Sequence, residues 1–143
     1  MSEEKTFSVE LELLRNYEFR VGFNLEGVGD LIMDEPPPGG EGKGPNASSL
    51  ILAAVGNCLS ASLSFCLRRS RVEVKGMKTE VEGTIARNEE GRWRIKEIKA
   101  RLHPEVDEGQ RNQLERCIEI FEQYCIATQS IRKGVDVDVE VVK

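Results

Sequence analysis

The chain has 143 residues, of which 31% are charged and 39% are hydrophobic, and its formal net charge is −5. This length predicts one domain spanning residues 1–143 with a single core, and the composition is ordinary for a globular protein. The negative charge argues against nucleic-acid binding, which needs a basic face. The charged segment Ser2-Glu3-Glu4-Lys5 is followed by no apolar run, so we expect no signal peptide and a cytoplasmic protein.

The first third of the chain alternates apolar and polar residues, as β-strands do. Residues 7–13 and 19–23 follow this pattern, and we expect them to form a hairpin with a tight turn at Arg15-Asn16. Residues 31–33 are a short third strand. Proline and glycine dominate residues 34–45, which cannot form regular structure and should lead into a central helix.

The stretch from Gly44 to Arg71 predicts one long helix. Leu, Ala, Ser and Cys dominate it, and these residues favour a helix over a strand. Asn46, Ser48 or Ser49 can cap its start. Its apolar residues cover nearly every face, so we expect burial all round. A membrane span is disfavoured because hydroxyl and amide side chains dilute the run, while the rest of the chain is highly charged.

A second hairpin should follow the helix. Residues 74–87 and 93–102 alternate as strands around a turn at residues 88–91. The alternation slips by one residue near Lys96-Glu97, which predicts a β-bulge. Pro104 should end the second strand, since proline cannot donate a ladder hydrogen bond.

The last segment predicts an amphipathic helix and a final strand. Asp107 and Gln110 resemble a capping box at the start of this helix, and Gly134 should end it. Valines then alternate with acidic residues over 135–141, as in a strand. The apolar face of the helix consists of Leu114, Cys117, Ile118, Phe121 and Cys125. This order of elements predicts an α+β fold with an antiparallel sheet.

Several common sites are not expected. His103, the single histidine, could act as a base, but its place at a strand end is typical of a surface residue. The cysteines at 58 and 66, and at 117 and 125, are each eight residues apart, whereas zinc knuckles have gaps of two to four. Gly42-Lys43 is followed by Gly44 instead of Ser or Thr, so the glycine-rich segment is no phosphate loop.

The four thiols remain the candidates for chemistry. In a reducing compartment we expect no structural disulfide framework. Cys66 and Cys117 have the surroundings of core residues. Cys58 follows Gly56-Asn57 inside the central helix, and Cys125 ends the apolar stripe of the second helix. A purely structural protein with core cysteines stays open as one interpretation.

One pattern is more specific. An Asp-x-Pro segment, a glycine-rich loop, Gly44-Pro45-Asn46 and a Leu/Ala run ending at Cys58 resemble the OsmC/Ohr superfamily of osmotically induced and organic hydroperoxide resistance proteins. A late cysteine before a short helix and a final strand also matches, at Cys125. The resemblance implies an OsmC-like fold, with an antiparallel sheet wrapped around a buried central helix in an intertwined homodimer. It also implies active sites at the subunit interface.

The same resemblance implies a function and its residues. Cys58 would attack organic hydroperoxides, Cys125 would trap the product as a disulfide, and an external dithiol would restore both, with no cofactor and no metal. A thiolate is the nucleophile, so a cation is expected near Cys58. Arg15 matches the family's usual place best, and Arg20 is second.

Some residues depart from the family pattern. Ser48 and Ser49 stand where the family often has an acidic residue, and Ala47 and Ile126 replace prolines. These departures motivate an alternative, in which a protein of this fold has weak or no peroxidase activity and binds a small apolar ligand at the dimer interface. Neither a membrane nor a nucleic-acid partner is expected.

Overall fold

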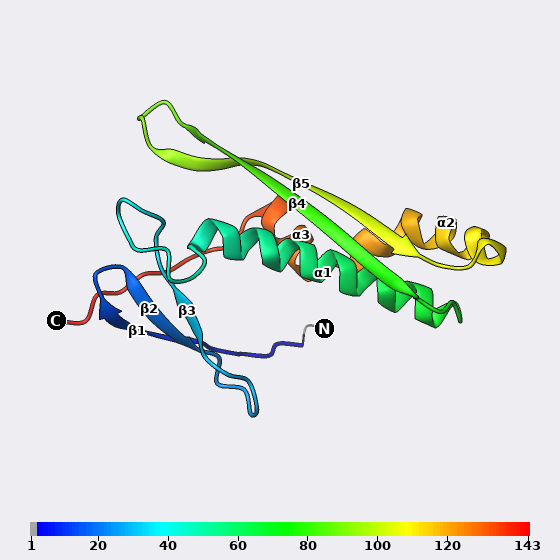
Figure 1. Ribbon diagram of the computed structural model, residues 1–143, viewed down its shortest axis with the longest axis horizontal. Coiled ribbons are helices and arrows are strands. Elements are labelled where there is room, and N and C mark those ends of the chain that lie inside the picture. The colour runs from blue at the N-terminus through cyan, green and yellow to red at the C-terminus, as the bar shows by residue number, and fades with distance from the viewer. Residues whose placement is uncertain (1–2) are drawn as a thin grey trace. The chain divides into compact units, whose positions relative to one another are not determined.

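The structure, a computed structural model, describes residues 3–143 and shows two compact units that divide after Leu50 (Figure 1). The first unit carries a small sheet and the loop that follows it. The second carries most of the long helix, a long hairpin and the C-terminal helices. The elements are therefore those of the expected α+β fold, while the expectation of a single domain stays a prediction.

The first unit is a three-stranded antiparallel sheet in the order β1-β2-β3, formed by β1 (Glu10–Arg15), β2 (Glu18–Gly22) and β3 (Leu31–Met33). Asn16 turns the chain between the first two strands with a φ of 47°, a conformation that asparagine tolerates better than most residues. The predicted hairpin and third strand are confirmed, although β1 begins at residue 10 instead of 7.

Asp34 organises the loop after β3. Its side chain is buried, and its carboxylate accepts hydrogen bonds from the backbone N–H groups of Glu35, Glu41 and Lys43 at 2.7, 3.2 and 3.1 Å. The N–H of Lys43, followed by those of Glu35 and Glu41, holds the pKa of Asp34 below its ordinary value. The proline- and glycine-rich loop thus has no regular structure, and backbone hydrogen bonds to one carboxylate hold it together.

The long helix, α1 (Ala47–Arg69), begins after Asn46, whose side-chain oxygen accepts the N–H of Ser49 at 3.0 Å. By length and composition α1 could cross a membrane, with a mean hydropathy of 1.9, but core helices share that composition. Its buried residues are Val55, Gly56, Leu59, Leu63 and Leu67, on one side. Burial all round was a wrong prediction for the single chain, in which Phe65 is 61% exposed.

The second hairpin pairs β4 (Gly76–Arg87) with β5 (Trp93–Glu105) in antiparallel register. Thr84 lies opposite Glu97 and Ile85 opposite Ile95, which leaves Lys96 as the extra residue of the predicted bulge. The prediction that Pro104 ends the strand was wrong, because β5 continues through it to Glu105. A two-stranded sheet accepts proline, since each strand has one edge that needs no partner.

The hairpin packs on α1 at a point of close approach, and Figure 1 shows its long ribbon running across the helix. A Cβ atom on Gly56 would lie 2.7 Å from Val81 Cγ2, closer than van der Waals contact allows. One turn later, the hydroxyls of Ser60 and Thr79 are 2.6 Å apart. Glycine at position 56 is therefore what lets α1 and β4 meet.

The C-terminal helical region begins with a single 3₁₀ turn, η1 (Glu108–Gln110), and continues through α2 (Arg111–Ile120), a second 3₁₀ turn, η2 (Phe121–Tyr124), and α3 (Ile126–Lys133). The expected capping box does not form, because Asp107 makes no capping hydrogen bond and pairs instead with the Lys75 ammonium at 2.5 Å. The predicted helix is real but interrupted at Cys125, whose φ of −84° and ψ of 103° are extended.

The end of the chain departs from expectation. Gly134 ends α3 with a φ of 77°, as predicted. The residues after it, however, form no strand, and Val135, Val137, Val139 and Val141 are 68–82% exposed. The alternating pattern is present without a neighbouring strand to pair with, so the final strand was a wrong prediction for the single chain.

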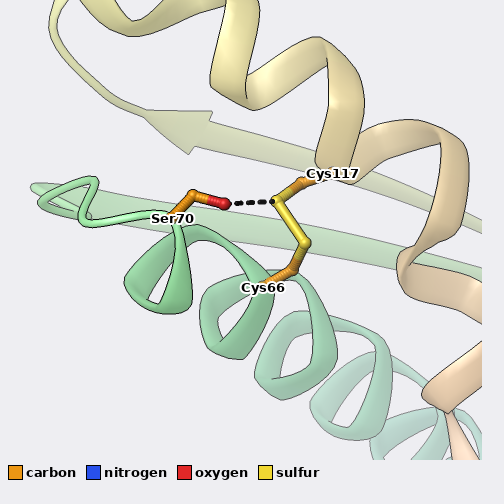
Figure 2. Close-up of a disulfide and its surroundings, with 3 residues drawn as sticks. All are labelled: Cys66, Ser70 and Cys117. Carbon is orange, nitrogen blue, oxygen red and sulfur yellow. Dashed lines mark hydrogen bonds between the residues drawn. A yellow bond between two sulfur atoms is a disulfide. The ribbon is translucent and has the colours of Figure 1, made fainter.

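The core of the second unit joins α1 to the C-terminal helices. Its buried members are Val55, Leu59, Leu63, Leu67, Val72, Cys117, Phe121 and Cys125. Within this core Cys66 of α1 and Cys117 of α2 form a disulfide, with their Cα atoms 5.8 Å apart (Figure 2). The expectation that no cysteines would form a structural disulfide was therefore wrong: the two residues are core residues, but the helices bring them within bonding distance.

The close approach at Gly56 gives a test of this packing. Glycine to alanine within a helix normally stabilises a protein by about 0.5–1 kcal/mol. Gly56→Ala should instead destabilise the chain by about 1–3 kcal/mol, because the new methyl group displaces Val81. Urea unfolding measures the difference. Gly109→Ala is the control, since open space surrounds that position, and equal effects at both sites would contradict the packing argument.

Candidate active site

Cys58 lies in the middle of α1 as a free thiol. Its side chain is half-buried and packs against the core of the second unit. The backbone N–H of Ala127, in the first turn of α3, points at its sulfur with a nitrogen–sulfur distance of 3.5 Å. Residues 69 positions apart in the sequence are thus in contact at this point.

Cys125, the second free thiol, is fully buried at the start of α3. Its sulfur accepts the N–H of Thr128 at 3.4 Å, so Cys125 is the N-cap of the helix. Its thiol also donates to the Thr128 hydroxyl at 3.0 Å. The sulfurs of Cys58 and Cys125 therefore bind neighbouring amides of one helix terminus, which brings the two predicted cysteines together.

This arrangement places a backbone N–H donor at each of the two sulfurs. The first N–H groups of a helix have no partner within the helix, and the helix dipole places partial positive charge there. A thiolate at Cys58 would convert the Ala127 contact into a charge-assisted hydrogen bond, which is stronger than a neutral one. Both N–H groups belong to the N-terminus of α3, which therefore contacts the thiol of Cys58 in α1 and the thiol of its own N-cap, Cys125.

Sequence reasoning missed Ala127 and Thr128, because only the distant N-terminus of α1 was considered. A signal was present. Cys125 stands three residues before Thr128, in the spacing of an N-cap and its N3 position, and Gly134 closes a helix of eight residues. A cysteine can cap a helix with its sulfur, although Ser, Thr, Asp and Asn are the usual residues.

The predicted arginines lie in the first unit. Arg15 ends β1, and its Nε is 4.0 Å from the carboxylate of Glu18. Arg20 lies in β2 and pairs with Glu12 at 2.9 Å and with Asp30 at 3.8 Å. Both guanidinium groups are substantially exposed. The approach of either one to Cys58, which belongs to the second unit, stays a prediction.

The second unit has a groove of about 490 Å³, whose wall includes neither Cys58 nor Cys125. Thr128, the hydrogen-bonding partner of Cys125, forms part of its wall. Most of the other walls are apolar, and Lys96, Glu97, Glu122 and Arg132 add charge. The apolar lining consists of Val55, Leu59, Ile95, Ile98, Ala100, Leu102, Phe121 and Ile131.

His103 is not part of this site. Its Nε2 is 2.9 Å from a carboxylate oxygen of Glu80 on the facing strand, and its side chain is 48% exposed, as expected of a surface residue. The hydrogen bond from His103 is the main cause that holds the pKa of Glu80 below its ordinary value. Within residues 3–143, no group of three or more His, Cys, Asp or Glu side chains is placed to hold a metal ion.

The Ala127 amide can be removed without deleting a side chain from the thiol pair. Proline at position 127 has no N–H to give, and this N–H has no partner within the helix. Hydrogen bonds to charged groups contribute about 1.5–3 kcal/mol, so Ala127→Pro should slow alkylation of Cys58 by iodoacetamide about tenfold.

Ile126→Pro is the matched control. It places proline at the first helical position, where the helix tolerates it, after the extended Cys125, and it keeps the Ala127 amide. Alkylation of Cys58 in this variant should match the original rate. Peptide mass spectrometry measures both rates, and equal slowing in both variants would mean that helix distortion, and not the lost amide, is responsible.

Comparison with known proteins agrees with the fold. The family model for OsmC-like proteins matches residues 40–140. Among curated proteins, none matches the sequence significantly. An OsmC-like protein of unknown function from Vibrio cholerae superposes with a TM-score of 0.76 at 14% identity, covering 89% of this chain and 94% of the other.

Two further structures carry functional descriptions. An organic hydroperoxide resistance protein from Legionella pneumophila has a TM-score of 0.65 at 18% identity, with 94% and 95% of the two chains covered. A putative organic hydroperoxide resistance protein from Vibrio cholerae, with captopril in one of its active sites, has a TM-score of 0.68 at 20% identity, with 95% and 90% covered. At these identities the structures establish the fold, and the family model covers most of the sequence, so the chain belongs to the OsmC-like family.

Proposed function

We propose that this protein is a cysteine-based peroxidase that reduces organic hydroperoxides with electrons from an external dithiol, as a defence against oxidative stress in the cytoplasm. The observation that carries the proposal is the contact of two free cysteines, Cys58 and Cys125, with adjacent amides of the α3 N-terminus. Relatives of the same fold are described as hydroperoxide resistance proteins, which supports this choice of substrate.

The chemistry proceeds in three balanced steps. The Cys58 thiolate attacks the terminal oxygen of the hydroperoxide, the O–O bond breaks, and the alkoxide leaves and takes up a proton as the alcohol. This leaves a sulfenic acid on Cys58. The Cys125 sulfur attacks it and forms the Cys58–Cys125 disulfide, with loss of water. A dithiol then returns two electrons and two protons and becomes a disulfide itself.

Each part of the site has a role in these steps. The half-buried Cys58 is open to a substrate, whereas the fully buried Cys125 is shielded until the first step is complete. Arg15 is the proposed cation that stabilises the Cys58 thiolate, with Arg20 second, because a guanidinium stays charged at every relevant pH. The apolar groove is suited to hold the alkyl part of an organic hydroperoxide.

The groove also supports the alternative function. A cavity of about 490 Å³ with apolar walls is within the range of small-molecule sites, so a weakly active protein could bind an apolar ligand there. Steady-state turnover of cumene hydroperoxide with dithiothreitol separates the two functions. Multiple turnovers favour the peroxidase, and binding of an apolar ligand without turnover favours the alternative.

Replacing each of the two proposed catalytic cysteines with serine should change hydroperoxide consumption in a different way. Cys58→Ser should abolish hydroperoxide consumption, because the nucleophile is gone. Cys125→Ser should consume about one equivalent and stop, with a sulfenic acid or its higher oxides on Cys58. Mass spectrometry after one equivalent of cumene hydroperoxide should find the 58–125 disulfide in the unaltered protein. Consumption that survives Cys58→Ser would refute the assignment.

The arginine assignment has its own test. Arg15→Ala should lower kcat/KM for cumene hydroperoxide by about tenfold or more, since it removes a charge that is worth about 1.5–3 kcal/mol in a charge-assisted hydrogen bond. Arg15→Lys keeps the charge and should recover part of the loss. Arg92→Ala is the control, because that residue lies in the turn between β4 and β5. An unchanged rate in Arg15→Ala would transfer the role to Arg20.

We further propose an obligate homodimer. The single chain exposes apolar side chains along β1 and the C-terminal segment, including Leu11 at 55%, Leu13 at 56% and Val139 at 82%. On α1, Phe65 is a further exposed apolar side chain. A second copy would cover these residues. Light scattering at micromolar concentration should give twice the chain mass, and a monomeric mass would contradict the proposal.

A further inference from the structure

The four cysteines form two pairs, and each pair has one cysteine in α1 and one in the C-terminal helical region. Cys66 of α1 is bonded to Cys117 of α2, while Cys58 of α1 and Cys125 meet at the start of α3. Along α1 the spacing from 58 to 66 is eight residues, and along the C-terminal segment the spacing from 117 to 125 is also eight. Cys66 is bonded to Cys117, and Cys58 contacts Ala127, close to Cys125. The two segments therefore run antiparallel, and the two cysteine pairs lie at two positions along them.

We propose that the Cys66–Cys117 disulfide is a positioning device for the proposed peroxidase reaction, which holds the Cys125 segment against α1 so that Cys125 can close on oxidised Cys58. This role rests on the proposed function. Cys66 and Cys117 are positioning residues, since they act through the two segments and touch no reacting atom.

The distance between the two cysteine pairs along α1 decides how the disulfide can act. Eight residues of α-helix span about 12 Å along the axis. That is far beyond the reach of a sulfur–sulfur exchange, so the 66–117 disulfide cannot receive electrons directly from Cys58. Its effect must pass through the backbone. Oxidation of Cys58 and its closure with Cys125 therefore involve no exchange with the Cys66–Cys117 bond.

The segment between Cys117 and Cys125 is short and is anchored at its middle, so fixing one end restrains the other. It consists of the last residues of α2 and the single 3₁₀ turn η2. Phe121, at the start of η2, belongs to the buried core, and Cys117 itself is 1% exposed. Figure 2 shows the disulfide spanning the gap between α1 and α2, with Ser70 beside the Cys117 sulfur at 3.9 Å.

This restraint would help the Cys58–Cys125 disulfide to form. Cys125 must give up its hydrogen bonds with Thr128 before its sulfur can bond Cys58, so the start of α3 has to open. Without the 66–117 bond, only the backbone path of 67 residues connects the two thiols. With it, the Cys125 segment also stays bonded to α1 eight residues from each thiol, so it is held in place while the start of α3 opens.

The test needs no variant. The full chain is equilibrated with oxidised and reduced dithiothreitol, in which each protein dithiol gives two electrons and two protons to the oxidised reagent. Acid quenching, alkylation and peptide mass spectrometry then count four forms: both pairs reduced, either disulfide alone, and both disulfides. The coupling factor is the product of the first and last populations divided by the product of the two intermediate ones.

We expect a coupling factor of at least ten, and linkage requires each disulfide to favour the other equally. A disulfide that only stabilises the folded chain would give a factor of one under conditions where every form is folded. A factor of one or less overturns the proposal. The measurement contains no peroxide, so a factor of ten without hydroperoxide turnover would reject the proposed function while leaving the coupling between the two cysteine pairs established.

Variants then locate the effect within the reaction. In Cys66→Ser/Cys117→Ser, sulfenic acid should form on Cys58 at the unaltered rate, while the 58–125 disulfide should form about tenfold more slowly. Cys66→Ala/Cys117→Val refills the apolar volume without the bond and should behave alike, which separates tethering from packing. Thermal melting confirms that both variants are folded. Normal closure in both folded variants would refute the positioning role.

Discussion

The packing of α1 against the C-terminal helical segment is the contact on which the candidate site depends. Leu63 and Leu67 are almost completely buried there, beside Cys117 and Cys125. Burying a leucine side chain stabilises a protein by about 1.5–3 kcal/mol, so this seam is held by much more than the weak contacts of the thiols. Cys58 can meet the start of α3 because the apolar residues around it fix both segments.

The break between η2 and α3 provides the free backbone amides at this contact. A continuous helix through position 125 would use its amides internally and offer none to a sulfur. The extended conformation of Cys125 restarts the helix, and the first amides of α3 become free to bind Cys125 and Cys58. One local interruption thus places the second thiol and supplies donors to both.

Much of the fold follows from local patterns. The alternation in residues 10–22, the cap at Asn46 and the slip at Lys96 each depend on neighbours in sequence, and the structure has all three. The errors came from long-range contacts. Asp107 pairs with Lys75 instead of capping, because the paired ammonium comes from a distant part of the chain. The valines after Gly134 have the pattern of a strand but no neighbour in the chain, since pattern alone does not provide a partner.

The cysteines show what sequence spacing can and cannot predict about disulfide pairing. The resemblance to the family pointed to Cys58 and Cys125, and both sulfurs contact the start of α3. The equal spacing of eight residues was visible in the sequence, but it excluded a zinc knuckle without suggesting a bond. Two helices that run antiparallel bring equally spaced residues opposite each other in reverse order, so the first cysteine of one faces the last of the other. Spacing could therefore predict the pairing of Cys66 with Cys117 only once the antiparallel packing was known, and that packing is a property of the core and not of the motif.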